Sequence, residues 1–321
     1  MSVVMRVPQP PTMPFVGNLR DLDTDRPVQG LMRLAETYGG FFKVSIPGME
    51  LFVAGSQEIV NELCDETRFG KKIDATLEHL RPVVADALFT AHDAEPNWGK
   101  AHRILVPAFG PLGVRSMFGG MRDIAEQMML RWERFGPDTV IDVPGDMTRL
   151  TLDTIALCAF DFRFNSFYRD GLHPFVGAMT GALDTALRRA LRPGFVNALD
   201  FTGNRKFEVD TAMLHQVAGE LIAERRADPD VAGKDDLLGR MVNGVDPETG
   251  EGLSDENIAN QMVTFLVAGH ETTSGLLSFA TYLLLRNPRV LERARQLVDE
   301  VVGDDVLQVE HLAKLRYLEQ I

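Results

Sequence analysis

The chain has 321 residues, of which 45% are hydrophobic and 25% charged, and its formal net charge at pH 7 is -13. These values fit a globular protein, and the acidic balance argues against nucleic acid or an anionic membrane as a partner, because both carry negative charge. The two cysteines show no pairing pattern, which excludes a disulfide framework and indicates a reducing compartment.

The N-terminus has no apolar core of signal-peptide length, because Met1 to Arg6 lead directly into a proline-rich stretch from Pro8 to Pro14. The only long apolar region carries His270 and Glu271 at its midpoint, which favours a protein core over a bilayer span. We therefore expect a cytoplasmic protein with no export signal and no membrane anchor.

A short β-hairpin is the first element that the sequence predicts. Apolar and polar residues alternate over Phe41 to Ile46 and over Met49 to Ala54, with Pro47-Gly48 between them as a turn. Beyond the hairpin, apolar residues recur at helical spacing in segments near residues 56–66, 96–106, 112–134, 146–160, 173–190 and 206–227. The sequence thus predicts a mainly α protein with a small N-terminal β-sheet, in a single domain over residues 1–321.

A long central helix is predicted over residues 254–286. Ser254 is a suitable N-cap, and two acidic residues in the first turn complement the helix dipole. Asn287-Pro288 ends the pattern. At about 1.5 Å per residue the helix would be roughly 45 to 50 Å long, so we expect it to cross the whole domain.

The middle of this helix holds an acid and hydroxyl groups between two almost wholly apolar flanks. A dry, unpaired Glu271 carboxylate there would cost several kcal/mol, so water, a partner or a cofactor is expected beside it. Ala268 and Gly269 share one stripe of the helix with Thr272, and their small size leaves a hollow. A flat group could lie against this hollow, with the Thr272 hydroxyl at its edge and Glu271 exchanging protons with water.

A packing interpretation explains the same residues without a ligand. The small residues could let a neighbouring helix approach closely, with His270 and Glu271 pointing outward and the threonines bonded to carbonyl groups of the preceding turn. Periodicity alone does not separate the two interpretations, so both stay open at this point.

Two motifs resemble those of cytochrome P-450 enzymes. Ala268 to Thr273, which read Ala-Gly-His-Glu-Thr-Thr, resemble at every position the central-helix signature of that family. Upstream, Asn97 to Arg103 resemble the family's Trp-x-x-x-Arg/His segment, whose polar groups bind the heme propionates. The resemblance implies that Trp98 and His102 bind heme and that the small residues of the hollow contact it.

Trp98 and His102 also suit that role by their spacing. They are four residues apart, hence on one face of a helix, and both side chains can donate hydrogen bonds to an anionic group. The plain alternative is a packed tryptophan beside an exposed histidine. Lys100 lies near both in the sequence but is expected to point to another side of the helix.

The resemblance covers the whole chain and is strongest to the bacterial fatty-acid hydroxylase type, whose heme domain is fused to a flavin reductase. It implies that the ring of Phe89 overhangs the heme and that Leu77 and Leu80 line the substrate pocket, although such residues are more often plain core. Where that subgroup holds the substrate carboxylate with an arginine and a tyrosine, this chain has Met49 and Val53. We therefore expect a neutral apolar substrate, or a carboxylate held by another residue.

The activity implied by the resemblance is that of a heme-dependent monooxygenase. Such an enzyme inserts one oxygen atom from O2 into a small apolar organic substrate, a fatty acid being one candidate. Electrons would come from NADPH through a flavin reductase as redox partner, fused or separate. Thr272 and Glu271 would be the catalytic residues, Thr272 by holding the bound oxygen and a water, and Glu271 by connecting that water to solvent.

The family's Glu-x-x-Arg pair and the later loop with the iron-ligating cysteine do not occur before Ile321. The resemblance therefore implies an incomplete cytochrome P-450 fold, with the axial cysteine expected beyond Ile321. Such a fragment is expected to be inactive alone and to expose apolar surface where the missing elements would pack. Neither Cys158 nor Cys64 is expected to be the ligand, because neither is flanked by the glycines and basic residues of a thiolate-iron loop.

Two other functions compete with this one. His270-Glu271 would suggest a zinc protease, but that motif requires a second histidine at the position of Ser274 and is excluded. A non-catalytic helical protein that binds or senses an apolar ligand would explain the hollow and the pocket residues. It would leave Trp98 and His102 without a role, and it stays the alternative to the monooxygenase.

Overall fold

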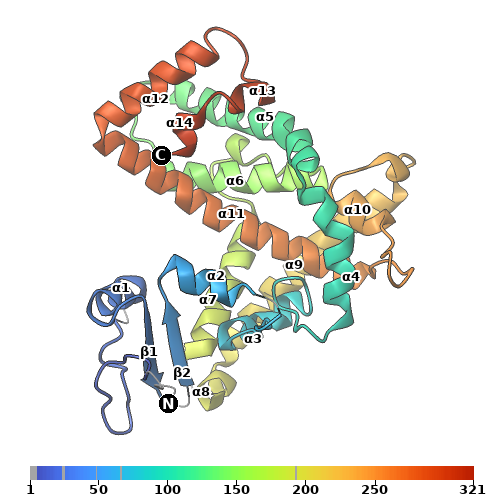
Figure 1. Ribbon diagram of the computed structural model, residues 1–321. Helices are drawn as coiled ribbons and strands as arrows, with labels where there is room; N and C mark the ends of the chain where they lie inside the picture. The colour runs from blue at the N-terminus through green and yellow to red at the C-terminus, as the bar shows by residue number, and fades with distance from the viewer. Residues whose placement is uncertain (1–5, 24–25, 48, 66, 192–193) are drawn as a thin grey trace. The chain divides into compact units, whose positions relative to one another are not determined.

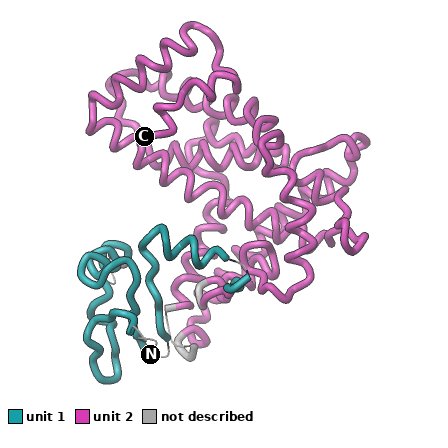
Figure 2. The backbone as a smooth tube through the Cα atoms, in the orientation of Figure 1, with its two compact units in different colours: residues 1–71 teal, residues 72–321 magenta. Residues whose placement is uncertain are grey.

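The computed structural model describes residues 6–23, 26–47, 49–65, 67–191 and 194–321. Two compact units make up the chain, residues 1–71 and residues 72–321, and Figure 2 shows them in different colours. Helices dominate, and the described residues contain one two-stranded antiparallel sheet. The predicted fold class, mainly α with a small N-terminal β-sheet, is confirmed. That residues 1–321 form a single functional domain stays a prediction.

The first unit is built around the predicted hairpin. β1 (Phe41–Ile46) pairs antiparallel with β2 (Met49–Ala54), which confirms both predicted strands. Gly48 of the predicted turn lies outside the described residues. Phe42 and Val44 of β1 are fully buried, as the alternation of side chains along a strand predicts. The helices of this unit are α1 (Pro27–Tyr38) and α2 (Gln57–Leu63).

The regular structure described in the second unit is helical. Its α-helices are α3 (Ala75–Val84), α4 (Pro96–Leu105), α5 (Pro111–Phe135), α6 (Val143–Phe160), α7 (Pro174–Leu191), α8 (Gly194–Leu199), α9 (Phe201–Ala227), α10 (Leu237–Asn243), α11 (Asp255–Arg286), α12 (Pro288–Val301), α13 (Val309–Leu312) and α14 (Arg316–Glu319). Short 3-10 turns are η1 (Val106–Phe109), η2 (Ser166–Tyr168) and η3 (Val231–Gly233). Each helical segment that the sequence predicts overlaps one of the α-helices, and α11 confirms the central helix.

The central helix α11 organises the packing of the second unit. Ser254 caps it by accepting a hydrogen bond from the Asn257 N–H at 3.2 Å, as its sequence predicts. α6 packs along α11, which also contacts α3, α9 and α10 (Figure 1). Leu152 of α6, Leu214 of α9 and Met262 of α11 are fully buried in the core that these helices share.

The two halves of α11 differ in burial. Residues 257–264 are buried without interruption, including the polar ones. In the second half, Leu276 and Leu285 are exposed, and Phe279 is 70% exposed. The sequence suggests a helix with two buried apolar flanks, which is wrong for the second flank. These side chains form an exposed apolar surface on the second half of α11.

No single helix of the described residues is both long enough and apolar enough to cross a membrane. One pair meets that test of length and composition when its members are taken together, namely α4 with η1 and α5, which are bent by 65°. The cytoplasmic location stays a prediction.

Replacing Leu152 with alanine is expected to lower the free energy of unfolding by about 2–5 kcal/mol, because the fully buried side chain would leave a cavity. Leu112→Ala is the matched control, since Leu112 of α5 is 84% exposed, and its effect should stay within about 0.5 kcal/mol. Urea unfolding followed by circular dichroism measures both variants. Equal effects would contradict the assignment of Leu152 to the core.

Candidate functional site

The signature in the middle of α11 is divided between two faces of the helix. Ala268, Glu271 and Thr272 are exposed, whereas His270 and Ser274 are buried. The Glu271 side chain is therefore accessible to solvent. Water can solvate its carboxylate, as expected from the sequence, which predicts water, a partner or a cofactor beside it. Its neighbour His270 points inward, contrary to the packing interpretation, and its Nδ1 lies 3.0 Å from the Leu266 carbonyl oxygen.

The hydroxyl groups of this segment bond to the preceding turn of their own helix. The Thr272 hydroxyl donates to the Ala268 carbonyl at 2.8 Å, and the Ser274 hydroxyl donates to the Glu271 carbonyl at 3.1 Å. These are the bonds that the packing interpretation expects. A hydroxyl that donates in this way keeps its lone pairs, so the Thr272 oxygen can still accept a hydrogen bond from a ligand or a water.

Gly269 faces a neighbouring helix. A Cβ atom on this glycine would lie 3.0 Å from Cγ1 of Ile155 on α6, closer than side chains normally pack. Next to it, the Thr151 hydroxyl of α6 donates to the His270 carbonyl at 2.9 Å. Of the three residues predicted to form the hollow, Ala268 and Thr272 share the exposed face, while Gly269 allows the close approach of α6. The predicted contact between Gly269 and heme stays a prediction.

Trp98 and His102 lie together on α4, as their spacing predicts. Their rings are stacked, with centroids 5.0 Å apart and an angle of 15° between the planes. Trp98 is half-buried and His102 is exposed. Pro96 at the start of the helix fits the first turn, where no N–H is needed. The stacked pair presents two potential N–H donors next to each other.

The opposite side of α4 is fixed to the loop before α11. Arg103 donates through Nε and Nη2 to the two carboxylate oxygens of Asp246, at 2.6 and 2.9 Å. Lys100 pairs with Glu251 at 2.7 Å, so it points away from the Trp98 side as predicted. The hydrogen bonds from the Arg103 guanidinium hold the pKa of Asp246, a fully buried side chain, far below its ordinary value.

The three predicted pocket residues have different environments. Phe89, in the turn between α3 and α4, is 54% exposed. Leu77 of α3 is half-buried, whereas Leu80 is buried in the main core with residues of α6 and α11. The position of Leu80 fits the plain-core alternative, and a pocket role for the three residues stays a prediction.

A row of buried polar residues on α11 was missed by the sequence interpretation. Asn257, Asn260, Gln261 and Thr264 are all buried. Their spacing of three or four residues is the signal that could have shown them, because polar side chains repeated on the inner face of a helix require partners. Gln261 has such a partner in the turn before α4, the Leu88 N–H at 3.1 Å.

Neither cysteine has the surroundings of a metal ligand. Cys158 lies between α6 and α5, with its Sγ 3.5 Å from the Met117 carbonyl oxygen, and burial raises the pKa of its thiol to about 11. Cys64 is exposed in the first unit. Within the described ranges, no group of three or more His, Cys, Asp or Glu side chains could hold a metal ion.

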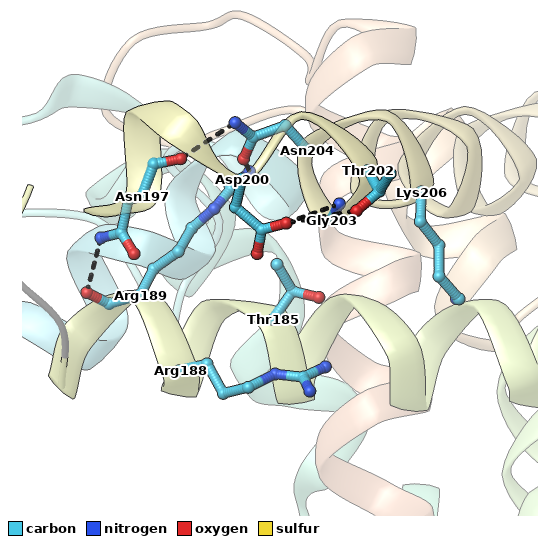
Figure 3. A pocket seen from close by; sticks show the side chains of 9 residues that line it. All are labelled: Thr185, Arg188, Arg189, Asn197, Asp200, Thr202, Gly203, Asn204 and Lys206. Carbon is cyan, nitrogen blue, oxygen red and sulfur yellow. Dashed lines mark hydrogen bonds between the residues drawn. The ribbon is translucent and has the colours of Figure 1, made fainter. Parts of the chain in front are cut away.

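A polar cleft of about 330 Å³ lies between α7 and α9, and Figure 3 shows it from close by. Its basic groups are engaged by the protein: Arg189 donates to Asn204 at 2.5 Å and Lys206 pairs with Asp210. Asp200 accepts from the Gly203 N–H at 3.0 Å. None of the predicted site residues lines this cleft, and we assign no ligand to it.

Comparison with known proteins decides the family. The family model described as cytochrome P-450 matches residues 7–321. The chain belongs to the cytochrome P-450 family. It is 49% identical over 314 residues to a bifunctional cytochrome P-450/NADPH–P-450 reductase of Acremonium egyptiacum, covering 98% of this chain and 30% of that protein. A protein of the same description from Fusarium oxysporum is 50% identical over 322 residues, covering 100% of this chain and 30% of the relative.

A third cytochrome P-450 relative is described as a self-sufficient monooxygenase of Exserohilum turcicum. It is 48% identical over 315 residues, which are 98% of this chain and 29% of the relative. The resemblance to the type fused to a reductase is thus confirmed, and the chain spans about 30% of the length of these relatives.

Membership in the cytochrome P-450 family implies heme as the cofactor, and part of the described surface fits it. Ala268 and Thr272 form a small, exposed patch on α11 against which a flat ring can lie. Trp98 and His102 carry two N–H groups side by side, which can donate to carboxylates. Cys158 is not part of this surface, because its Sγ lies 3.5 Å from the Met117 carbonyl oxygen of α5.

The two thiols are expected to react at very different rates. At pH 8 about one in a thousand Cys158 thiols would be ionised, given its pKa of about 11, and partial burial further slows a reagent. An aromatic disulfide reagent should therefore label Cys64 quickly and Cys158 much more slowly. Cys64→Ser is the control and should remove the fast phase. Rapid labelling of folded Cys64→Ser would contradict the raised pKa of Cys158.

Asp246→Asn is expected to lower the melting temperature at pH 7, because it removes the charged acceptor of Arg103. The pKa of Asp246 is depressed in the folded state, so its contribution is present above the unfolded pKa of about 3.9 and is lost as pH falls toward the folded value. The difference between the two proteins should thus be steady from pH 7 to 5 and shrink below about pH 4. Calorimetry across this range checks it, with exposed Asp235→Asn as control.

Proposed function

We propose that the protein to which this chain contributes is a heme-dependent monooxygenase, which inserts one oxygen atom from O2 into a small apolar organic substrate. The observation that carries the proposal is the exposed patch of Ala268, Glu271 and Thr272 on α11, in a chain of the cytochrome P-450 family. Heme supplies the iron at which oxygen is activated when it is bound.

Residues of α4 and of α11 would hold the cofactor. Trp98 and His102 would donate hydrogen bonds to its carboxylates, which need such partners when they leave bulk water. Ala268 would leave room for a flat group, because its side chain is a single methyl group. The Arg103–Asp246 pair would hold α4 in place during this binding.

Thr272 and Glu271 would deliver protons. The Thr272 hydroxyl now donates to the Ala268 carbonyl, and rotation about its χ1 bond would turn it toward a water on the exposed face. Glu271 is adjacent in the chain and exposed, so its carboxylate can exchange protons with solvent. The pair would therefore connect the reaction site to bulk water through one hydroxyl and one carboxylate.

An apolar substrate suits the residues nearest to the predicted pocket. Phe89 offers an exposed aromatic ring and Leu77 a half-buried aliphatic side chain. In the first unit, Met49 and Val53 of β2 carry no charge with which to bind a carboxylate. If a fatty acid is the substrate, another group would hold its carboxylate. NADPH is the proposed electron source, through a flavin reductase of the kind fused to the relatives.

The absorption spectrum of the reduced, carbon-monoxide-bound protein tests this function. We expect a red-shifted thiolate band after heme reconstitution of a chain extended to the length of the relatives, and no such band for residues 1–321 alone. If neither chain binds heme, the monooxygenase is excluded and the non-catalytic binding protein takes its place.

Thr272→Ala in the heme-loaded, complete protein is expected to separate reductant use from product formation. Without the hydroxyl, proton delivery to the reaction site would be less efficient. We expect about 10²-fold less product per NADPH oxidised, with hydrogen peroxide formed instead of product. Product and peroxide are measured together. Thr273→Ser, which alters an adjacent exposed residue, is the control. Unchanged coupling in Thr272→Ala would remove this residue from the mechanism.

A further inference from the structure

The turn at residues 85–90 presents Phe89 from a segment whose other residues are buried or half-buried. The ring of Phe89 is more than half exposed, whereas the adjacent Thr90 is fully buried. Ala85, which begins the turn, has a φ of 42° and a ψ of -122°. A residue other than glycine keeps this conformation only where its surroundings hold it, and such strain is found preferentially at functional sites.

Two long side chains hold the turn on either side of Phe89. Gln261 of α11 accepts a hydrogen bond from the Leu88 N–H at 3.1 Å through its Oε1. Arg81 of α3 donates through Nη1 to the Thr90 carbonyl oxygen at 2.6 Å. The residues before and after Phe89 are therefore each fixed by a hydrogen bond to another element. The ring itself has no such restraint and faces outward.

The orientation of the Gln261 amide is determined by a chain of hydrogen bonds. Its Nε2 donates to Asn257 Oδ1 at 3.2 Å, and Asn257 Nδ2 donates to Asp86 Oδ1 at 3.1 Å. The second oxygen of Asp86 accepts from Asn97 Nδ2 at 2.7 Å. Because the carboxylate can only accept, each amide in this chain is oriented, and Gln261 must present its oxygen to Leu88.

Burial makes this hydrogen bond important for the turn. Gln261 is fully buried, so its replacement by an apolar residue takes away an acceptor that holds the Leu88 N–H from inside the core. The free energy of one such hydrogen bond is comparable to the cost of a strained backbone conformation such as that of Ala85. Loss of the acceptor would therefore allow the turn to relax and the ring of Phe89 to move.

We propose that Gln261 is a positioning residue for substrate selectivity. Its hydrogen bond to the Leu88 N–H fixes the turn that presents Phe89, and the fixed ring determines which carbon of an apolar chain is oxidised. The inference rests on the proposed function. Gln261 acts through the turn without touching the substrate, and it joins the predicted oxygen-binding helix to the predicted substrate-binding ring.

The first test uses the 321-residue chain without cofactor. Gln261→Leu keeps a side chain of similar size and removes the acceptor, so hydrogen exchange of the Leu88 amide should rise about five- to tenfold, the factor for one net hydrogen bond. Thr264→Val is the matched control, because its buried hydroxyl donates to the Asn260 carbonyl of the same helix at 2.8 Å. It should leave that rate unchanged. An unchanged Leu88 rate in Gln261→Leu overturns the proposal.

Gln261→Ala serves if the leucine variant does not fold, since the smaller side chain leaves space for a water. Gln261→Glu retains an oxygen that can accept from the Leu88 N–H, and it should keep the exchange rate close to that of the unaltered protein. A rise in both Gln261→Leu and Gln261→Glu would show a general loss of packing and would also overturn the proposal.

The second test uses the complete, heme-loaded protein with two probes, dodecanoic acid and the uncharged dodecane. Positional isomers of the product are separated by gas chromatography and mass spectrometry. Gln261→Leu should shift their distribution in the direction of Phe89→Ala, while Thr264→Val leaves it unchanged. In the Phe89→Ala background, Gln261→Leu should cause no further shift, because the ring through which it acts is gone.

The outcomes separate this proposal from the function on which it rests. No product from the unaltered protein with either probe overturns the monooxygenase, and with it the role in selectivity. Product with an unchanged distribution in Gln261→Leu overturns only the role of Gln261. A full additional shift in the double variant would show that Gln261 acts independently of Phe89, and it would likewise overturn the proposal.

Discussion

The close contact between α6 and α11 is the constraint on which the second unit depends. Gly269 permits it, because a Cβ atom there would meet Ile155 at 3.0 Å. The contact sets the rotation of α11 about its own axis, and that rotation decides which parts of the signature are exposed. Ala268 and Thr272 lie on the outer face as a result. The glycine thus contributes to the site through packing, whether or not its backbone also meets a ligand.

Polar groups inside this unit specify its arrangement more narrowly than apolar packing would. Apolar cores tolerate rearrangement as long as volume is kept, whereas a buried amide accepts only partners with the right donors and acceptors. The hydrogen bonds from Gln261 to Asn257 and from Asn257 to Asp86 match donors with acceptors in this way. The paired Arg103 and Asp246 do the same between α4 and the loop before α11. Both networks fix segments that carry predicted ligand contacts.

Helices with a repeated apolar pattern could be predicted from the sequence, as could the hairpin and the short helix α2, whereas α3, α10 and α12 were not predicted. Helices such as α6 and α11 repeat their apolar pattern over several turns, and the ends of α11 are marked by Ser254 and Asn287-Pro288. The seven-residue helix α10 is too short for a periodic signal. Its cap, Asp236, also pairs with Arg225 of α9, a tertiary contact that local sequence does not reveal.

The candidate site could also be predicted only in part. The pairing of Trp98 with His102 follows from a spacing of four residues, and the structure brings the rings together. The exposure of Glu271 and the inward direction of His270 could not be derived, because the phase of a helix is set by its neighbours. Recognition of the family supplied roles for these residues that periodicity left open.

The hydrogen bond between Leu88 and Gln261 joins residues that are 173 positions apart, and the one between Asp86 and Asn257 spans 171 positions. During synthesis, the turn that carries Phe89 leaves the ribosome long before its partner helix exists. It can reach its final conformation only after α11 has been made and has docked. The turn to which we assign substrate selection is therefore translated early but reaches its final conformation late. Incorrect docking of α11 would leave this turn without the hydrogen bonds that fix it.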